Sequence, residues 1–162
     1  YKISSASLTD KGLLKALRNT GKPLVISSGM STIEQIRGAV DFLGIDDLII
    51  LHCTSTYPCP VEELNLKMIT TLKNEFDCPV GYSGHEIGLW PTVATVALGV
   101  SFIERHITLD RAIWGSDQAS SVEPQRLQKL VRTIRTIEGA MGDGIKKVYA
   151  SEEPIIARLR TL

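Results

Sequence analysis

The chain has 162 residues, 43% hydrophobic and 22% charged, with a formal net charge of zero. A chain of this length buries one core, so one domain is expected. The balanced charge and the lack of a basic stripe argue against nucleic acid as a partner, and every apolar run is shorter than the roughly 20 residues that span a membrane.

The start and the cysteines suggest where the chain belongs. It opens at Tyr1 without a charged and then apolar leader, so we expect no signal peptide and a piece of a longer protein. Cys53, Cys59 and Cys78 are odd in number and lack paired spacing. Free thiols in a reducing compartment, and therefore a cytoplasmic location, are expected.

Short apolar runs recur along the chain, each ending in small or polar residues. The intervals between them fit one strand plus one helix. The five runs predict strands at residues 1–3, 24–26, 48–51, 79–81 and 102–103.

Helical patterns lie between these runs. Ser31 and Glu34 have capping-box spacing and predict the start of a helix that ends at Gly44. A weaker helix is predicted over 66–76. The segment 90–98 is apolar nearly all round, so we expect it to be buried on several sides. The last clear helix follows Pro124 and ends at Gly142, and the mixed, charged tail 145–162 suggests a linker or a partly docked extension.

Continuous apolar strands that alternate with helices predict an α/β fold with a parallel sheet covered by helices. Five strands fit either an open doubly wound sheet or an arc of an eight-stranded barrel. No GxGxxG follows the first strand, so a dinucleotide-binding fold has no support. In both architectures, functional residues gather at the carboxyl ends of the strands.

Two histidines stand at such ends. His85 and His106 follow consecutive predicted strands, so parallel neighbours would bring both imidazoles to one rim. Two neutral imidazoles there can bind one divalent metal ion. The alternative is two unrelated polar histidines. Nearby carboxylates could fix the orientation of the imidazoles, namely those of Glu86, Glu104, Asp110 and Asp117.

The third histidine, His52, directly follows the apolar run 48–51. Successive residues of a strand point to opposite faces, so its side chain need not face the rim. We therefore expect a structural, hydrogen-bonded His52 and not a metal ligand.

Serines occupy equivalent points after four successive strands, at Ser5, Ser27, Ser55 and Ser83. Hydroxyls and free backbone N–H groups that converge on one mouth suit a phosphate or carboxylate. Lys2, inside the first run, would supply the positive charge. The alternative is that these serines simply end strands and cap helices.

Two loop segments after strands could close over a ligand. They would place the Tyr57 hydroxyl and the Asp117 carboxylate against hydroxyls of a polar substrate. The alternative for Tyr57-Pro58 and for residues 114–117 is ordinary turn formation.

These motifs follow one another in a fixed order that resembles the sialic acid synthase family, which comprises N-acetylneuraminate synthases and their legionaminate and pseudaminate relatives. The resemblance covers nearly the whole chain. It is carried by Lys2-Ile3-Ser4-Ser5, Val25-Ile26-Ser27-Ser28-Gly29-Met30, Leu51-His52-Cys53-Thr54-Ser55-Thr56-Tyr57-Pro58, Gly81-Tyr82-Ser83-Gly84-His85, Glu104-Arg105-His106-Ile107-Thr108-Leu109-Asp110 and Gly115-Ser116-Asp117.

The resemblance implies a (β/α)₈ TIM barrel followed by an antifreeze-like domain. Residues 1–144 would be the C-terminal half of the barrel, from about the fourth strand to the eighth, and 145–162 the linker toward the missing domain, which in this family reaches across a homodimer. The family condenses phosphoenolpyruvate with an N-acetylmannosamine-type sugar to a nonulosonic (sialic) acid and releases phosphate by C–O cleavage.

The resemblance also implies roles for individual residues. His85 and His106 match ligands of Mn²⁺ or Mg²⁺, and Tyr57 and Asp117 match contacts to the sugar. Phosphoenolpyruvate would be held by Lys2, Ser5, Ser27, Ser83 and, less specifically, Ser55, because many bacterial members carry Asn there. Lys2, Tyr57 and Asp117 are the predicted catalytic residues. Ser7 replaces an acidic residue that contacts the sugar in some members, so the acceptor's identity stays open.

The first three strands of such a barrel are absent, so we expect the isolated segment to be inactive and its two open sheet edges to favour pairing or aggregation. Two alternatives remain. One is a non-catalytic barrel fragment or scaffold, and the other is a metal-dependent aldolase-type barrel enzyme that uses pyruvate.

Overall fold

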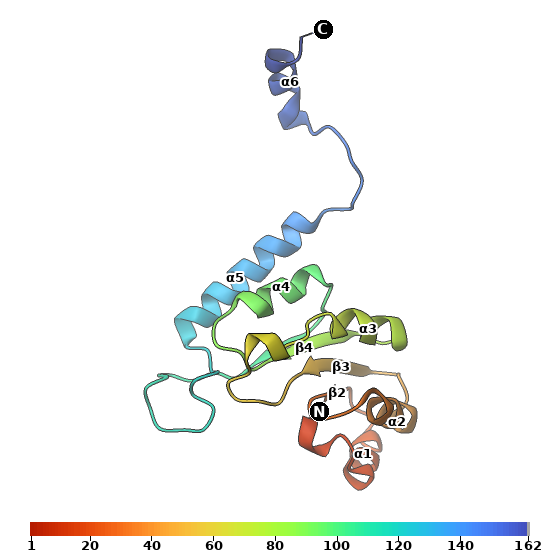
Figure 1. The fold of residues 1–162 in the computed structure, drawn as a ribbon. Coiled ribbons are helices and arrows are strands. Elements are labelled where there is room, and N and C mark those ends of the chain that lie inside the picture. The colour runs from red at the N-terminus through yellow and green to blue at the C-terminus, as the bar shows by residue number, and fades with distance from the viewer. Residues whose placement is uncertain (162) are drawn as a thin grey trace.

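The structure is a computed structural model and describes residues 1–161. Five strands form one parallel sheet in the order β1-β2-β3-β4-β5 (Figure 1). The strands are β1 (Lys2–Ile3), β2 (Leu24–Ser27), β3 (Leu48–Cys53), β4 (Val80–Gly84) and β5 (Ile103–Arg105).

The strand order decides between the two architectures that the sequence left open. A doubly wound sheet reverses its strand order at a switch point, whereas here the spatial order equals the chain order throughout. Each crossover therefore continues in the same direction. The result is a curled half-barrel of five βα units.

The helices are α1 (Lys11–Arg18), α2 (Ile33–Leu43), α3 (Met68–Glu75), α4 (Trp90–Ala97), α5 (Pro124–Met141) and α6 (Glu153–Leu159). Short 3-10 turns cover Ser5–Ser7, Val61–Glu63 and Ala150–Glu152. None of the helices in residues 1–161 has the length and apolarity needed to cross a membrane.

Helix α1 was not predicted, although local signals for it exist. The Asp10 side chain accepts a hydrogen bond from the Leu13 amide and caps the helix, and Leu14 packs into the core.

The predicted cap of α2 is wrong by one residue. Thr32 Oγ1 accepts from the Gln35 amide and Gln35 Oε1 accepts from the Thr32 amide, so Thr32 and Gln35 form the capping box. The Ser31 hydroxyl donates instead to the Gly29 carbonyl, at 3.2 Å. Ser31 thus belongs to the turn that leaves β2, and the helix begins after it.

Helix α4 is also less enclosed than its composition suggests. Its inner face is formed by Thr92, Val93, Thr95 and Val96, all buried, whereas Trp90 is 73% exposed. The prediction of burial on several sides is therefore wrong, because two threonines, and not the alanines, occupy the face toward the sheet.

The apolar core lies between the sheet and helices α1 to α4. Alternate strand residues supply it, namely Ile3, Leu24, Ile26, Leu48, Ile50, Val80 and Tyr82. The intervening residues point to the inside of the curl. The side chains that carry chemistry must therefore lie at the carboxyl ends of the strands and on this inner face.

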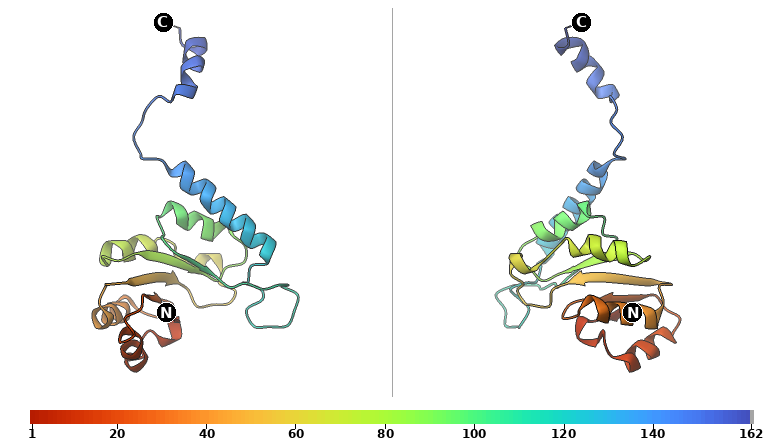
Figure 2. Two further views of the ribbon diagram at one scale, coloured as in Figure 1. Left: turned by 180° about the vertical axis from the view of Figure 1, so that it is seen from behind. Right: turned by 45° about the vertical axis from the view of Figure 1, so that its right-hand side comes forward.

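The C-terminal tail leaves the sheet. Helix α5 packs against α4, and the chain then extends to α6, which lies away from the other elements in each view (Figure 2). None of the residues of α6 is buried. The described part of the tail, residues 145–161, is thus an extended arm that includes a short helix.

Candidate functional site

The sheet register places the inner-face side chains in two layers at the carboxyl ends of the strands. Cys53 is paired with Ser83, and Ser83 with Glu104, so these three residues form one layer. Ser55, His85 and His106 each follow two residues later and therefore form the layer above it.

The two predicted histidines lie together in the upper layer. The rings of His85 and His106 are perpendicular, with centroids 5.2 Å apart. The ring of Tyr57 contacts both, at centroid distances of 4.2 Å from His85 and 5.3 Å from His106. Neighbouring parallel strands thus bring both imidazoles to the same side of the sheet.

Each imidazole is oriented through its Nδ1 atom. His85 Nδ1 lies 2.8 Å from the Thr54 carbonyl, and His106 Nδ1 lies 3.2 Å from Asp117 Oδ2. A protonated Nδ1 that donates to such an oxygen leaves Nε2 with its lone pair. Both Nε2 atoms can therefore act as ligands.

The predicted orienting carboxylates behave differently from one another. Asp117 orients His106 as expected. Asp110 instead accepts a hydrogen bond from the Ala112 amide and stabilises the turn in which it lies. Glu86 lies on the outer face of the sheet, fully buried and paired with Arg105, so its predicted role beside the imidazoles is wrong. Glu86 directly follows His85, and strand alternation turns its side chain away.

Glu104 links the lower layer to the lysine. The Ser83 hydroxyl donates to Glu104 Oε1 at 2.7 Å, and Lys2 Nζ lies 3.6 Å from Glu104 Oε2. About a third of each charged side chain of this pair is exposed, so the pair adds little to stability. Its consequence is to hold an ammonium group beside Ser83.

Cys53 stands at the centre of the serine cluster, a position that sequence reasoning missed. Its Sγ lies 3.6 Å from Ser5 Oγ, 3.7 Å from Ser55 Oγ and 3.7 Å from His85 Nδ1. Period-two alternation from Leu51 could have placed it on the inner face.

This convergence depends on Gly29. A Cβ atom there would lie 2.8 Å from Ser5 Oγ and 3.1 Å from Cys53 Sγ, and closer still to Ser55 Oγ. The Gly29 amide donates to Ser5 Oγ at 3.1 Å. Only a residue without a side chain lets the three polar atoms meet.

Ser27 lies one layer deeper and differs from the other serines. Ser27 is 2% exposed, and its hydroxyl has no hydrogen-bond partner among residues 1–161. A buried hydroxyl without a partner is costly, so an additional group is needed to satisfy it.

Burial and hydrogen bonding shift the pKa of several of these groups. Burial lowers the pKa of His85, but its contacts with the Cys53 thiol and the Thr54 carbonyl outweigh burial and raise it overall. Burial raises the pKa of Cys53, whereas the hydrogen bond from His85 lowers it, and the net direction is down. A polar, hydrogen-bonded cluster therefore lies at the end of β3.

His52 is structural, as predicted. Its Nε2 lies 2.7 Å from the Leu64 carbonyl, and the residue is buried. Burial lowers its pKa, so the ring stays neutral and donates to that carbonyl.

A cavity of about 620 Å³ opens beside the cluster, on the side of α2. Cys53 and Ser55 line it together with Ser31 and Thr32 at the start of α2. The space therefore adjoins Cys53 and Ser55, whereas His85 and His106 are not among its lining residues.

The donor set for a metal ion is incomplete within the described chain. Residues 1–161 contain no group of three or more His, Cys, Asp or Glu side chains arranged to hold one. Two oriented imidazoles fit a divalent ion whose remaining ligands come from substrate or water. The residues present thus suit such an ion without enclosing it.

The parallel half-barrel carries two histidines and several hydroxyls at the carboxyl ends of its strands, an arrangement typical of α/β enzymes. Comparison with known proteins identifies its family. The chain matches the NeuB family over residues 1–146 and belongs to that family. It is 41% identical over 165 residues to the N,N'-diacetyllegionaminic acid synthase of Campylobacter jejuni, covering 99% of this chain and 49% of that protein.

Human N-acetylneuraminate-9-phosphate synthase is 41% identical over 156 residues, covering 94% of this chain and 43% of the human protein. The crystal structure of the N-acetylneuraminic acid synthetase of Leptospira borgpetersenii, in complex with citrate, superposes with a TM-score of 0.87 at 35% identity, over 97% of this chain and 56% of that one. The chain thus spans about half the length of its relatives.

Proposed function

We propose that this chain is the C-terminal half of the catalytic TIM barrel of a sialic acid synthase-type enzyme. Such an enzyme would join phosphoenolpyruvate to an N-acetylmannosamine-type sugar and form a nonulosonic acid. The main support is the convergence of His85 and His106 above a layer that contains Ser83 and the Lys2–Glu104 pair, in a chain of the NeuB family.

The anionic donor suits the lower layers. Lys2 and the hydroxyls of Ser5 and Ser83, together with Ser55 from the layer above, would neutralise and hydrogen-bond the phosphate and carboxylate of phosphoenolpyruvate. The unpartnered, buried hydroxyl of Ser27 supports a ligand that reaches this depth.

The sugar suits the upper layer. Mn²⁺ or Mg²⁺ would be held by Nε2 of His85 and His106, and when bound it would polarise the aldehyde of the open-chain sugar as a Lewis acid. The Tyr57 hydroxyl and the second carboxylate oxygen of Asp117 would bind sugar hydroxyls, while Oδ2 keeps His106 oriented.

In the reaction, the methylene carbon of phosphoenolpyruvate attacks the aldehyde carbon and forms the new C–C bond, and the aldehyde oxygen takes up a proton. Water adds to the neighbouring carbon, which bears the phosphate ester oxygen, and loses its protons. The C–O bond to that oxygen breaks, phosphate leaves with it, and a ketone remains. The residues of this chain orient the two substrates and neutralise the donor's charge, so their contribution is positioning and electrostatics.

The proposal extends to the whole protein. Residues 145–162 would lead toward an antifreeze-like domain, and the complete enzyme would be a cytoplasmic homodimer. By itself the 162-residue chain would be inactive, because the remaining strands of the barrel would complete the site.

A chimera tests this proposal in a complete barrel. The chain would replace the matching segment of the Campylobacter jejuni synthase, and phosphate release from phosphoenolpyruvate would be measured with N-acetylmannosamine-type acceptors. We expect turnover that disappears in His85→Ala and His106→Ala but persists in Asp110→Asn, which lies in the same region of the chain. A folded chimera without turnover would refute the proposal, and turnover with free pyruvate in place of phosphoenolpyruvate would favour an aldolase.

A further inference from the structure

A buried ion pair lies directly behind the two histidines. Glu86 follows His85 at the end of β4, and Arg105 precedes His106 at the end of β5. The same two strand ends therefore carry imidazoles on the inner face and an ion pair on the outer face. The side chains of Arg105 and Glu86 are 2% and 0% exposed.

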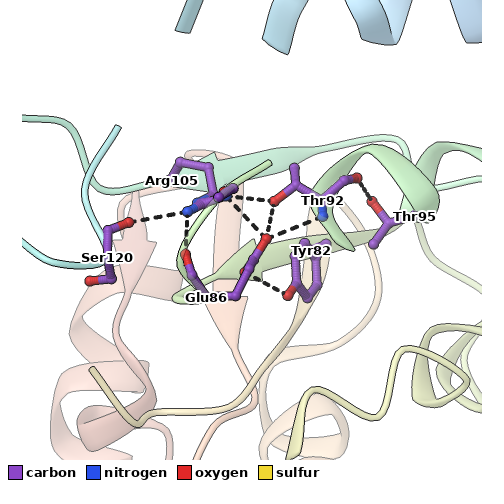
Figure 3. Close-up of polar contacts among 7 residues, drawn as sticks. Tyr82, Glu86, Thr92, Thr95, Arg105 and Ser120 are labelled. Carbon is purple, nitrogen blue, oxygen red and sulfur yellow. Dashed lines mark hydrogen bonds and ion pairs between the residues drawn. The ribbon is translucent and has the colours of Figure 1, made fainter. Parts of the chain in front are cut away.

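The pair makes many hydrogen bonds, although Arg105 Nε is buried without a partner among residues 1–161. Arg105 Nη1 lies 3.1 Å from Glu86 Oε1, and Nη2 donates to the Glu86 carbonyl at 2.8 Å. The Thr92 amide and hydroxyl donate to Glu86 Oε1, and the Tyr82 hydroxyl donates to Oε2 (Figure 3). Burial and the Glu86 carboxylate raise the pKa of Tyr82, so it remains a donor.

The guanidinium also holds the loop that carries Asp117. Arg105 Nη2 donates to the Ser120 carbonyl at 3.1 Å, and the Ser120 amide and hydroxyl donate to the Asp117 carbonyl. Asp117 in turn orients His106 at 3.2 Å. Arg105 thus connects the backbone after His85, its own strand before His106 and the loop whose Asp117 carboxylate orients His106.

Gly84 shows how closely the strand end fits this pair. A Cβ at Gly84 would lie 2.6 Å from Glu86 Oε2 and 3.1 Å from Arg105 Cδ. The backbone of β4 therefore passes directly against both charged side chains.

Stability alone does not account for the arrangement. Desolvation of two buried charges often cancels their attraction, and apolar replacements of such pairs are frequently neutral or stabilising. What apolar side chains cannot provide is a planar fork that fixes two strand ends and a loop at defined distances.

We propose that the Glu86–Arg105 pair is the positioning device that sets the separation and facing of His85 and His106. The inference rests on the proposed function, in which these two imidazoles hold a divalent ion. Glu86 and Arg105 contact neither ion nor substrate, so they act through the backbone and through Asp117.

The test compares Mn²⁺ affinity and ring geometry in the chimera described above, in which the barrel is complete. The Mn²⁺ affinity of Glu86→Gln and Arg105→Lys would be measured by electron paramagnetic resonance, which detects free Mn²⁺. Contacts between the rings would be measured by NOEs in the metal-free protein, for His85, His106 and Tyr57. Ile69→Ala, a buried change in α3 away from the histidines, is the control for general loss of stability.

We expect Arg105→Lys to weaken Mn²⁺ binding by about 10- to 100-fold and to weaken the ring NOEs, with Glu86→Gln in the same direction. Ile69→Ala should leave both readouts unchanged at a comparable loss of thermal stability. Unchanged affinity and NOEs in the two pair variants, or an equal loss in Ile69→Ala, would overturn the inference. A chimera with the wild-type segment that binds no Mn²⁺ would contradict the proposed metal site, while the NOEs alone would still decide the positioning role.

Discussion

Substitution of Gly29 by alanine tests the convergence of the serines most directly. The new methyl group would meet Ser5 Oγ at 2.8 Å and Cys53 Sγ at 3.1 Å, and would displace Ser55 Oγ. Overpacking of this kind costs about 1–3 kcal/mol. The hydroxyls can rotate away, but only by leaving the positions in which they face the mouth.

Gly38→Ala is the matched control. Gly38 lies within α2, and apart from its chain neighbours and the backbone of its own helix, no atom of residues 1–161 lies within 4 Å of an added Cβ. Alanine therefore removes only the entropic cost of glycine in a helix. We expect Gly38→Ala to raise the free energy of unfolding by about 0.5–1 kcal/mol. The two substitutions add the same methyl group, but we expect opposite changes in the free energy of unfolding.

The assay is thermal and urea unfolding of the chain, together with the Michaelis constant for phosphoenolpyruvate in the chimera. For a chain of this size, 1 kcal/mol corresponds to about 2–4 °C in Tm. Gly29→Ala should lower Tm and raise the Michaelis constant, and Gly38→Ala should raise Tm without affecting that constant. If Gly29→Ala matched wild type in both measurements, the serines and Cys53 would not be packed as tightly as described.

Three further predictions concern single side chains. Ser27→Ala should leave the free energy of unfolding unchanged or raise it slightly, since the hydroxyl has no partner in the described part of the chain, yet weaken phosphoenolpyruvate binding in the chimera. Asp117→Asn should lower Mn²⁺ affinity by about 10-fold in a titration while Asp110→Asn does not, because only Asp117 orients His106. Burial lowers the pKa of His52, so the contribution of the neutral ring to stability is complete above about pH 6.5 and is lost as the pH falls toward the folded-state pKa. Between pH 7 and pH 5, urea unfolding should therefore show a smaller loss in the free energy of unfolding for His52→Gln than for wild type.

Each of these has a contrary outcome. A clear loss of stability in Ser27→Ala would show that the hydroxyl has a structural partner. Equal Mn²⁺ affinities of Asp117→Asn and wild type would remove the orienting role of that carboxylate. Equal losses of stability on acidification in wild type and His52→Gln would place the responsible titration elsewhere, for example at groups whose pKa also shifts on folding.

The five strands and the histidine rim could be predicted from the sequence because both depend on local periodicity. Strands buried on both faces give continuous apolar runs, and parallel strands end at one edge. The sequence therefore predicts that His85 and His106 lie together, and the ordered motifs indicate the family. The site residues outside these motifs gave weaker signals, and Cys53, which only alternation along β3 places on the inner face, was missed.

What periodicity does not encode is which elements become neighbours. The choice between a doubly wound sheet and a half-barrel depended on strand order, and both alternatives have the same alternation of strands and helices. The partners of Glu86 likewise depend on the packing of β4, β5 and α4. This packing places Arg105 and Thr92, and not the nearby imidazoles, within hydrogen-bond distance of the Glu86 carboxylate. The pattern of apolar residues along a chain is local. Which charges and strands pair depends on the distances between segments that are far apart in the sequence, and only the tertiary structure fixes those distances.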